Sequence, residues 1–118
     1  MGILNYSTGV PVDRTLQQII GILVSHGAKA VLANYNNAHE PEGLSFIVPS
    51  SKGSLSFRLP ANIEAVGKVM EREHLSGYRK EGQPARVAWR ILKDWIEAQM
   101  AIIEAEMTSL EQVFLPYL

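Results

Sequence analysis

Apolar and polar residues repeat along the chain with two different periods, and the changes of period divide it into segments. Over 13–26, apolar residues recur every three to four positions, which is typical of a helix with one buried face. Asp13 suits the N-cap of this helix, and Gly27 suits the left-handed residue that follows a helix. The apolar positions are Leu16, Ile19, Ile20, Leu23 and Val24. We therefore expect a helix over 13–26, after an irregular lead-in over 1–12.

Alternation of apolar and polar residues then predicts three strands. The first covers about 29–33 and is followed by a predicted loop over 34–43. Two further alternating stretches, 44–48 and 54–59, are joined by a short segment that contains a glycine, which is a hairpin signal. Pro60 ends the last strand, because proline has no N–H to donate to a ladder.

Helical periodicity returns in the second half of the chain. A second helix is predicted to begin near Asn62 and to end in the charged run over 71–74. The polar segment 75–83 contains two glycines and is predicted to be a mobile loop. Pro84 fits the first turn of a third helix, which is predicted to extend to about residue 107. Such a helix would be roughly 35 Å long at about 1.5 Å per residue.

The last residues predict a short helical turn and an apolar tail. Thr108-Ser109-Leu110-Glu111 has the spacing of a capping box. The tail 113–118 is rich in apolar residues, and we expect it to dock on the body of the protein or on another subunit. The element order is then α-β-β-β-α-α. This order predicts a single α+β domain over 1–118, in which a small antiparallel three-stranded sheet packs on helices and the third helix is long.

Composition and charge narrow the range of functions. The 118 residues include 11 Lys and Arg against 12 Asp and Glu, so the formal net charge is −1. A protein that coats nucleic acid is usually basic, so the nearly equal numbers of positive and negative residues make that role less favoured. The absence of cysteine excludes disulfides, thiol nucleophiles and zinc–thiolate sites. No apolar run has the length of a membrane span, and the start lacks a basic secretory signal, so we expect a cytoplasmic protein without membrane contact.

Signals for an enzyme or a metal site are weak. His26, His39 and His74 lie far apart in the sequence, and each suits a cap or a surface position better than a general base. Glu71 and His74 match half of a di-iron helix motif, but a second copy of the motif is missing. The sequence contains no glycine-rich phosphate loop, nucleophile elbow or zinc-protease motif. We therefore expect a non-enzymatic protein without a cofactor or a bound metal.

The start of the third predicted helix carries cations beside a tryptophan. Arg86, Arg90 and Lys93 share one helical face, and Trp89 is three or four residues from two of them. Guanidinium groups next to an indole suit a phosphate attached to a stackable base. Arg86 also opposes the helix dipole, which favours a compensating anion. The alternative interpretation is the solvated face of a long helix. The candidate anion or nucleotide site consists of Arg58, Arg86, Trp89, Arg90 and Lys93, with Tyr78, Arg79 and Lys80 as additional loop contacts.

The same helix predicts an interface between two copies of the chain. Its first half is basic, whereas its second half carries Glu97, Glu104 and Glu106, so two antiparallel copies would match in charge. Its apolar stripe is about twice as long as a strand of five or six residues, which spans about 17–20 Å. The excess would be exposed unless a second subunit or the tail covered it. The predicted interface of a homodimer, or of a higher even-numbered assembly, consists of Trp95, Ile96, Gln99, Met100, Ile103 and Met107.

Four short motifs carry a resemblance to a known group of proteins. Leu44-Ser45-Phe46, Phe57-Arg58-Leu59-Pro60, Arg86-Val87-Ala88-Trp89-Arg90 and Val113-Phe114-Leu115-Pro116-Tyr117 resemble signatures of a family of small phage and prophage proteins. The resemblance extends over nearly the whole chain, from Val12 to Leu118. It implies an accessory role for a phage inside its bacterial host, and it implies neither a mechanism nor functional residues.

These observations lead to one function and two alternatives. The leading hypothesis is a phage-encoded binding protein that captures a phosphate-bearing ligand, such as a signalling nucleotide, and thereby counters host defence. A compact group of cations suits a small anion better than a long polymer. One alternative is an accessory protein of recombination or replication that binds single-stranded nucleic acid. The other is a protein–protein inhibitor of a host defence enzyme, with the helix face or the tail as its contact surface.

Overall fold

The computed structural model describes residues 2–50, 53–74, 80–105 and 109–118. It confirms the predicted element order and the α+β class, with a long third helix. The elements are α1 (Val12–Ser25), β1 (Ala30–Tyr35), β2 (Pro41–Ser50), β3 (Gly53–Pro60), α2 (Ile63–Arg72), α3 (Gln83–Glu104), α4 (Leu110–Phe114) and the 3₁₀ helix η1 (Leu115–Tyr117).

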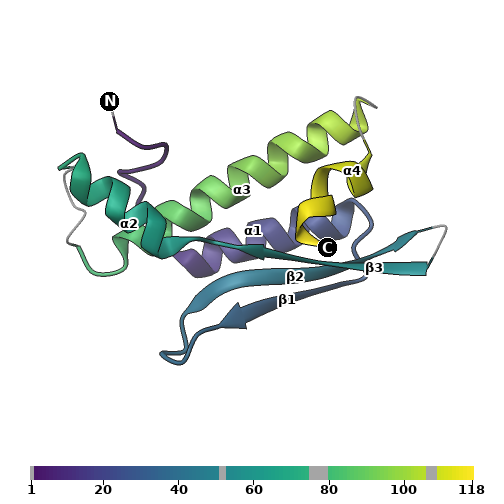
Figure 1. Ribbon diagram of the computed structural model, residues 1–118, viewed down its shortest axis with the longest axis horizontal. Coiled ribbons are helices and arrows are strands. Elements are labelled where there is room, and N and C mark those ends of the chain that lie inside the picture. The colour runs from purple at the N-terminus through teal and green to yellow at the C-terminus, as the bar shows by residue number, and fades with distance from the viewer. Residues whose placement is uncertain (1, 51–52, 75–79, 106–108) are drawn as a thin grey trace.

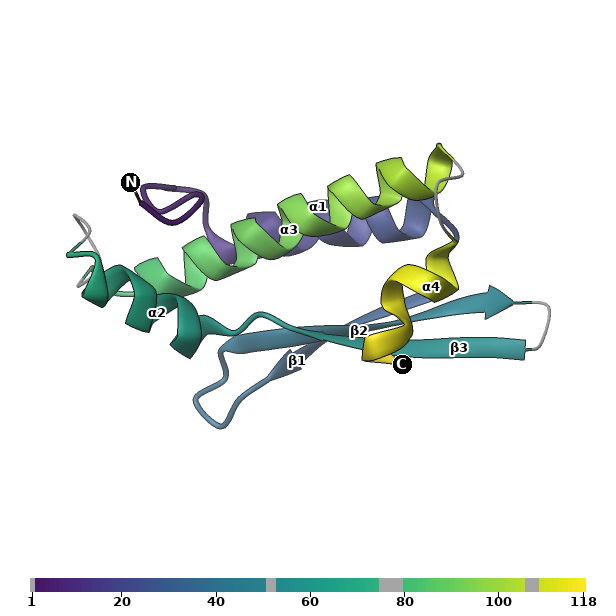
Figure 2. The ribbon, with the colours of Figure 1, turned by 45° about the horizontal axis from the view of Figure 1, so that its top comes forward.

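The helices cover one face of a three-stranded antiparallel sheet, whose strands follow the chain order β1-β2-β3. Figures 1 and 2 show α1 and α3 side by side on this face, with α2 against the first part of α3 and α4 near its end. Alternation along the strands explains the one-sided cover, because Leu44, Phe46 and Phe57 point toward the helices and are buried. Leu32 and Arg58 belong to the opposite, solvent-facing set.

β2 begins earlier than its alternation predicts. Part of the predicted loop over 34–43 belongs to the strand, and Pro41 pairs with Tyr35 across a register irregularity. A proline is tolerated there because it is the first residue of the strand. Gly43 allows β3 to approach closely, since a Cβ at this position would lie 2.8 Å from the Leu59 carbonyl oxygen. Proline and glycine are typical loop residues, and their strand roles here depend on neighbours that the local pattern does not contain.

The helix boundaries agree with the prediction to within a few residues, but some of the caps differ. α1 begins at Val12 after the N-cap Pro11, so the predicted N-cap Asp13 is wrong and this residue lies in the first turn. Its carboxylate still stabilises the positive end of the helix dipole. Gly27 follows the C-cap His26 with the predicted positive φ, which is 105°.

The capping box of α4 lies one residue later than predicted. The Ser109 hydroxyl accepts from the Gln112 N–H, and the Ser109 N–H donates to the Gln112 side-chain oxygen. Glu111, which was expected to close the box, lies in the first turn of α4 instead, and Thr108 lies outside the described residues. Glutamine and glutamate serve this position equally, so two overlapping stretches of the sequence satisfied the motif.

Phe114 of α4 completes a core of aromatic rings. Its ring centroid lies 5.2 Å from that of Phe46 and 5.7 Å from that of Phe57, and all three residues are buried. Trp95 of α3 packs edge-on against Phe114 at 5.5 Å and against Tyr117 at 5.8 Å. Such pairs contribute about 0.5–1.5 kcal/mol each beyond their buried area. The cluster therefore fixes α4 and η1 between the sheet and α3.

Candidate functional site

Trp89 lies in the core, so its predicted role as a stacking residue for a ligand is wrong. Its exposed fraction is 0%, and its indole Nε1–H donates to the Pro41 carbonyl oxygen, 3.3 Å away. Helical spacing places Trp89 at the border of the face that carries the arginines. The start of β2 reaches that border and covers the indole, and this tertiary contact has no signature in the local sequence.

Arg86 and Arg90 lie half-buried at the surface with neutral partners. Arg86 Nε donates to Gln83 Oε1 at 3.0 Å, and its Nη2 donates to the Glu81 carbonyl oxygen at 3.1 Å. Arg90 Nη1 donates to the Gln18 side chain of α1. Among the described residues, no carboxylate lies within 4.0 Å of either guanidinium. Within the described part of the chain, the predicted cluster therefore keeps uncompensated charge at these two arginines and at the exposed Lys80.

Of the remaining helix and loop residues of the predicted cluster, the structure describes Lys93 and Lys80. Lys93 Nζ lies 2.8 Å from Glu97 Oε2 within the same helix. Lys80 is exposed just before α3. Tyr78 and Arg79, with most of the predicted mobile loop, lie outside the described residues.

Arg58 lies apart from the arginines of α3. Because residues alternate along β3, its side chain lies on the solvent-facing side of the sheet, opposite to the buried Phe57 and Leu59. Its Nη2 lies 4.0 Å from Glu42 Oε1, and it lines a hollow of about 600 Å³ together with Glu40 and Glu64. No contact between described residues links Arg58 to the guanidinium groups of α3. The five predicted site residues are therefore not brought together.

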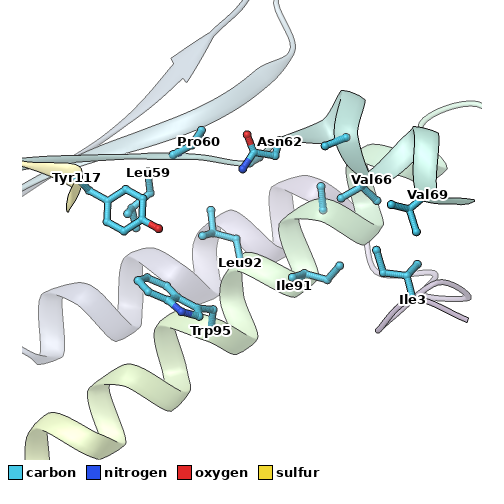
Figure 3. A pocket seen from close by; sticks show the side chains of 13 residues that line it. Ile3, Leu59, Pro60, Asn62, Val66, Val69, Ile91, Leu92, Trp95 and Tyr117 are labelled. Atoms are coloured by element: carbon cyan, nitrogen blue, oxygen red, sulfur yellow. The ribbon is translucent and has the colours of Figure 1, made fainter. Parts of the chain in front are cut away.

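An apolar pocket of about 410 Å³ lies between α2 and α3 (Figure 3). Its floor is α3, one wall is α2, and the end of β3 and η1 enclose it from the other sides. Its lining residues are Ile3, Leu59, Pro60, Ala61, Asn62, Ala65, Val66, Val69, Ala88, Ile91, Leu92, Trp95 and Tyr117. None of these 13 residues is charged.

The relative lengths of the helices explain why the pocket exists. α2 has 10 residues and α3 has 22, so α2 covers only the first part of this face of α3. The two helices approach closely at the start of α3, where a Cβ added to Gly67 would lie 3.6 Å from the Pro84 Cβ. Farther along, Tyr117 covers α3 through its contact with Trp95. The pocket is the gap between these two covers.

Asn62 and Tyr117 bring polar side-chain atoms to this apolar surface. Asn62 is the N-cap of α2 with a left-handed backbone, φ 55°, and its side chain makes no capping hydrogen bond to the helix. Figure 3 shows Asn62 at one rim, with the Tyr117 hydroxyl pointing into the space from the side. An amide and a phenol hydroxyl can each donate and accept. The pocket can therefore hold an apolar body and orient one uncharged polar group.

The sequence alone did not reveal this pocket, because its walls come from four separate segments. Each segment has the apolar spacing of ordinary core packing, and none contains a motif for a ligand. The one feature of the sequence that pointed toward the pocket was a difference in helix length. The second predicted helix is short and the third is long, so the second cannot cover the whole of the third. The sequence does not show that the tail returns to α3 and places Tyr117 against Trp95. For this reason the difference in length predicted an exposed apolar stripe and a dimer, and it did not predict a pocket.

Two of the predicted interface residues belong to the core of the subunit. Ile96 is 0% exposed and Met100 is 2% exposed, because α1 and α4 pack along this part of α3. Trp95, Gln99 and Ile103 are half-buried within the subunit. Met107 lies outside the described residues. The apolar stripe of α3 is thus covered largely by the chain itself.

Part of the charge of α3 is compensated within the subunit. Lys93 pairs with Glu97, as described, and His26 Nε2 lies 2.8 Å from Glu104 Oε1, which joins the ends of α1 and α3. Glu106 lies outside the described residues. An antiparallel pairing of third helices therefore loses most of the exposed stripe that predicted it, and within the described part of α3 it keeps unmatched charge only at Arg86 and Arg90.

Comparisons with protein-family models, curated proteins and solved structures gave no match. Within the described part of the chain, no helix is long and apolar enough to cross a membrane. No group of three or more acidic or histidine side chains among these residues is placed to hold a metal ion. The candidate sites are accordingly the α2–α3 pocket and the pair Arg86 and Arg90.

Proposed function

We propose that this protein is a non-catalytic binding protein whose ligand is a neutral, mainly apolar small molecule held in the α2–α3 pocket. The observation that carries the proposal is the combination of a volume of about 410 Å³ with a lining that contains no charged residue. Ligand pockets in proteins typically have about 300–1,000 Å³ and mostly apolar walls with a few placed polar groups. The Asn62 amide and the Tyr117 hydroxyl supply such groups.

The lining selects against ionised ligands. A phosphate or carboxylate inside the pocket would lose its hydration without meeting a cation, and burying an unpaired charge costs several kcal/mol. An uncharged aromatic or aliphatic body gains instead, because about 100 Å² of apolar surface removed from water contributes about 2.5 kcal/mol before association costs. The pocket therefore favours a ligand of a different class from the nucleotide that the sequence predicts.

A neutral fluorescent probe, N-phenyl-1-naphthylamine, tests this proposal. We expect its emission to rise on titration with the protein and the emission of Trp95, which lines the pocket, to fall by energy transfer. Ala65→Phe should abolish the signal by filling the pocket from α2, because Ala65 is one of its lining residues. The matched control is Ala98→Phe, an exposed alanine of α3 outside the pocket. Equal binding by both variants, or no binding by the unmodified folded protein, would reject the pocket as the site.

A second candidate function is supported by the neutral partners of Arg86 and Arg90. Guanidinium groups held by glutamine and carbonyl oxygens keep their charge available to an anion, and the first turn of α3 contains no acidic residue. On this basis we propose capture of a small phosphate-bearing ligand at the α3 surface. The resemblance to phage proteins makes a signalling nucleotide of the bacterial host the first ligand to test, in a counter-defence role.

Thermal-shift measurements with cyclic and linear nucleotides, and with short single-stranded DNA, distinguish the forms of this second candidate. Stabilisation by a nucleotide that is lost in Arg86→Gln/Arg90→Gln, and retained in the exposed-lysine control Lys68→Gln, supports a small-anion site. Binding to DNA alone, with steep weakening by salt, supports the nucleic-acid alternative. Unchanged melting with every ligand removes the arginine pair as a binding site.

A further inference from the structure

β1 forms an edge of the sheet that the described part of the chain leaves unpaired. The strand pairs with β2 on one side, and the sheet ends there. The other edge strand, β3, is better protected from strand addition, because it ends in Pro60 and has η1 packed against it. Figure 1 shows β1 as the outermost ribbon on its side of the sheet. An unpaired edge presents a row of free N–H and C=O groups that fits another strand.

The sequence of β1 lacks the usual protection of an edge. Ala-Val-Leu-Ala-Asn-Tyr contains neither a charged residue nor a proline, which are the common means of preventing strand addition. Leu32 is 65% exposed and Tyr35 is 57% exposed on this strand. Ile47 of β2, opposite Ala30 and on the same sheet face as Leu32, is also exposed. The edge therefore combines open backbone with an apolar solvent-facing side.

α1 contributes a second apolar surface above the same edge. It lies on the β1 side of the sheet, and its residues Gln18 and Ile22 face α3. Helical spacing puts Ile20 and Val24 on the opposite flank, away from α3. Val24 is 54% exposed and Ile20 is half-buried. A partner that extends the sheet at β1 and brings a helix of its own would cover this flank as well.

We propose that β1 pairs antiparallel with β1 of a second copy of this chain, so that the two sheets form one six-stranded sheet. A second copy fits both surfaces at once, because the twofold axis that pairs the strands also places the two α1 helices on the same face of the joined sheet. The absence of charge on β1 removes like-charge repulsion across that axis. The proposal is independent of the α2–α3 pocket, which lies at the β3 side of the fold.

The irregularities at both ends of β1 fix the register of the pair. The ladder with β2 is irregular between Asn34 and Tyr35, and the Lys29 N–H donates to the Ile47 carbonyl outside the regular register. The regular segment is then 30–34, whose centre is Leu32. Antiparallel pairing about this centre places Leu32 opposite Leu32 of the second copy. Lys29 of each copy then lies at opposite ends of the pair, about 20 Å apart at about 3.3 Å per residue.

Cysteine cross-linking tests both the partner and the register, because the chain contains no cysteine. Directly opposed residues of an antiparallel pair have Cα atoms about 4.5–5.5 Å apart, which lies within the range of a disulfide. We expect Leu32→Cys to form a covalent dimer almost completely on mild oxidation. The control is Ser56→Cys, an exposed residue of the same sheet face on β3, which should remain mostly monomeric on denaturing gels.

The oligomeric state of the unmodified protein provides the decisive measurement. Light scattering coupled to size exclusion should give the mass of two chains at high micromolar concentration. Leu32→Lys, which changes an exposed side chain and keeps the fold by circular dichroism, should reduce the mass to one chain and raise the dissociation constant by at least tenfold. A monomer for the unmodified protein, or a dimer that persists in Leu32→Lys, would overturn the proposal, as would equal cross-linking of the two cysteine variants.

Discussion

On one side of α3, Arg86 and Arg90 contact α1 and the segment before the helix, and on another side Ile91 and Trp95 line an apolar pocket. The first surface is conspicuous in the sequence because guanidinium groups at helical spacing carry an obvious chemistry. The second consists of residue types that fill any core. The difference shows that local patterns locate charge, whereas the presence of a pocket depends on how far neighbouring elements extend along the helix.

The largest expected effect concerns Trp89, which the sequence assigns to the ligand surface and the structure assigns to the core. Trp89→Ala should lower the free energy of unfolding by about 3–5 kcal/mol, because it leaves a large cavity and removes the hydrogen bond to Pro41. Urea unfolding followed by circular dichroism measures the change. A loss below about 1 kcal/mol would mean that the indole is not packed as described.

An intermediate effect is expected at Gln83, which connects the two sides of α3. Its buried amide Nε2 donates to the Tyr6 and Thr8 carbonyl oxygens, while its Oε1 accepts from Arg86. Gln83→Ala should cost about 1–3 kcal/mol of stability, because carbonyl groups lose their donor. It should also weaken probe binding, since the segment held by Gln83 carries Ile3 of the pocket wall. If the stability falls but the probe affinity stays unchanged, the hydrogen bonds of Gln83 do not influence the α2–α3 pocket.

A smaller effect is expected when Arg90 is replaced. Arg90→Met keeps the aliphatic stem and removes hydrogen bonds to neutral side chains, so the stability should change by about 1 kcal/mol or less. Binding of the neutral probe in the α2–α3 pocket should remain unchanged. A strong loss of probe affinity would show that the two sides of α3 are coupled.

The smallest effect is expected for the ion pair between Lys93 and Glu97. The Glu97 side chain is 57% exposed and the Lys93 side chain 15% exposed, and ion pairs between residues i and i+4 of a helix contribute about 0.3–0.5 kcal/mol. Lys93→Gln should therefore change the unfolding midpoint only slightly, and moderate salt should remove the difference. A salt-independent loss would instead assign Lys93 to packing through its stem.

The order of the elements and most of their boundaries could be predicted, because helical and strand periods depend on residues close in sequence. The positive φ of Gly27 could be predicted for the same reason, because it depends on the end of the helix directly before it. The failures at Pro41, Trp89 and Ile96 have one physical cause, namely a contact with a segment distant in sequence. Such contacts decide which side of a helix is covered and whether a covered side retains a gap.

During translation, Phe46 and Phe57 leave the ribosome long before Phe114, the ring that completes their packing. A nascent chain that has emerged only to the end of α3 can form the hairpin, but it cannot bury the apolar face of that hairpin fully. During this interval the exposed apolar face of the hairpin makes the nascent chain prone to aggregate. α4 therefore sets the moment at which the newly made chain becomes a finished domain.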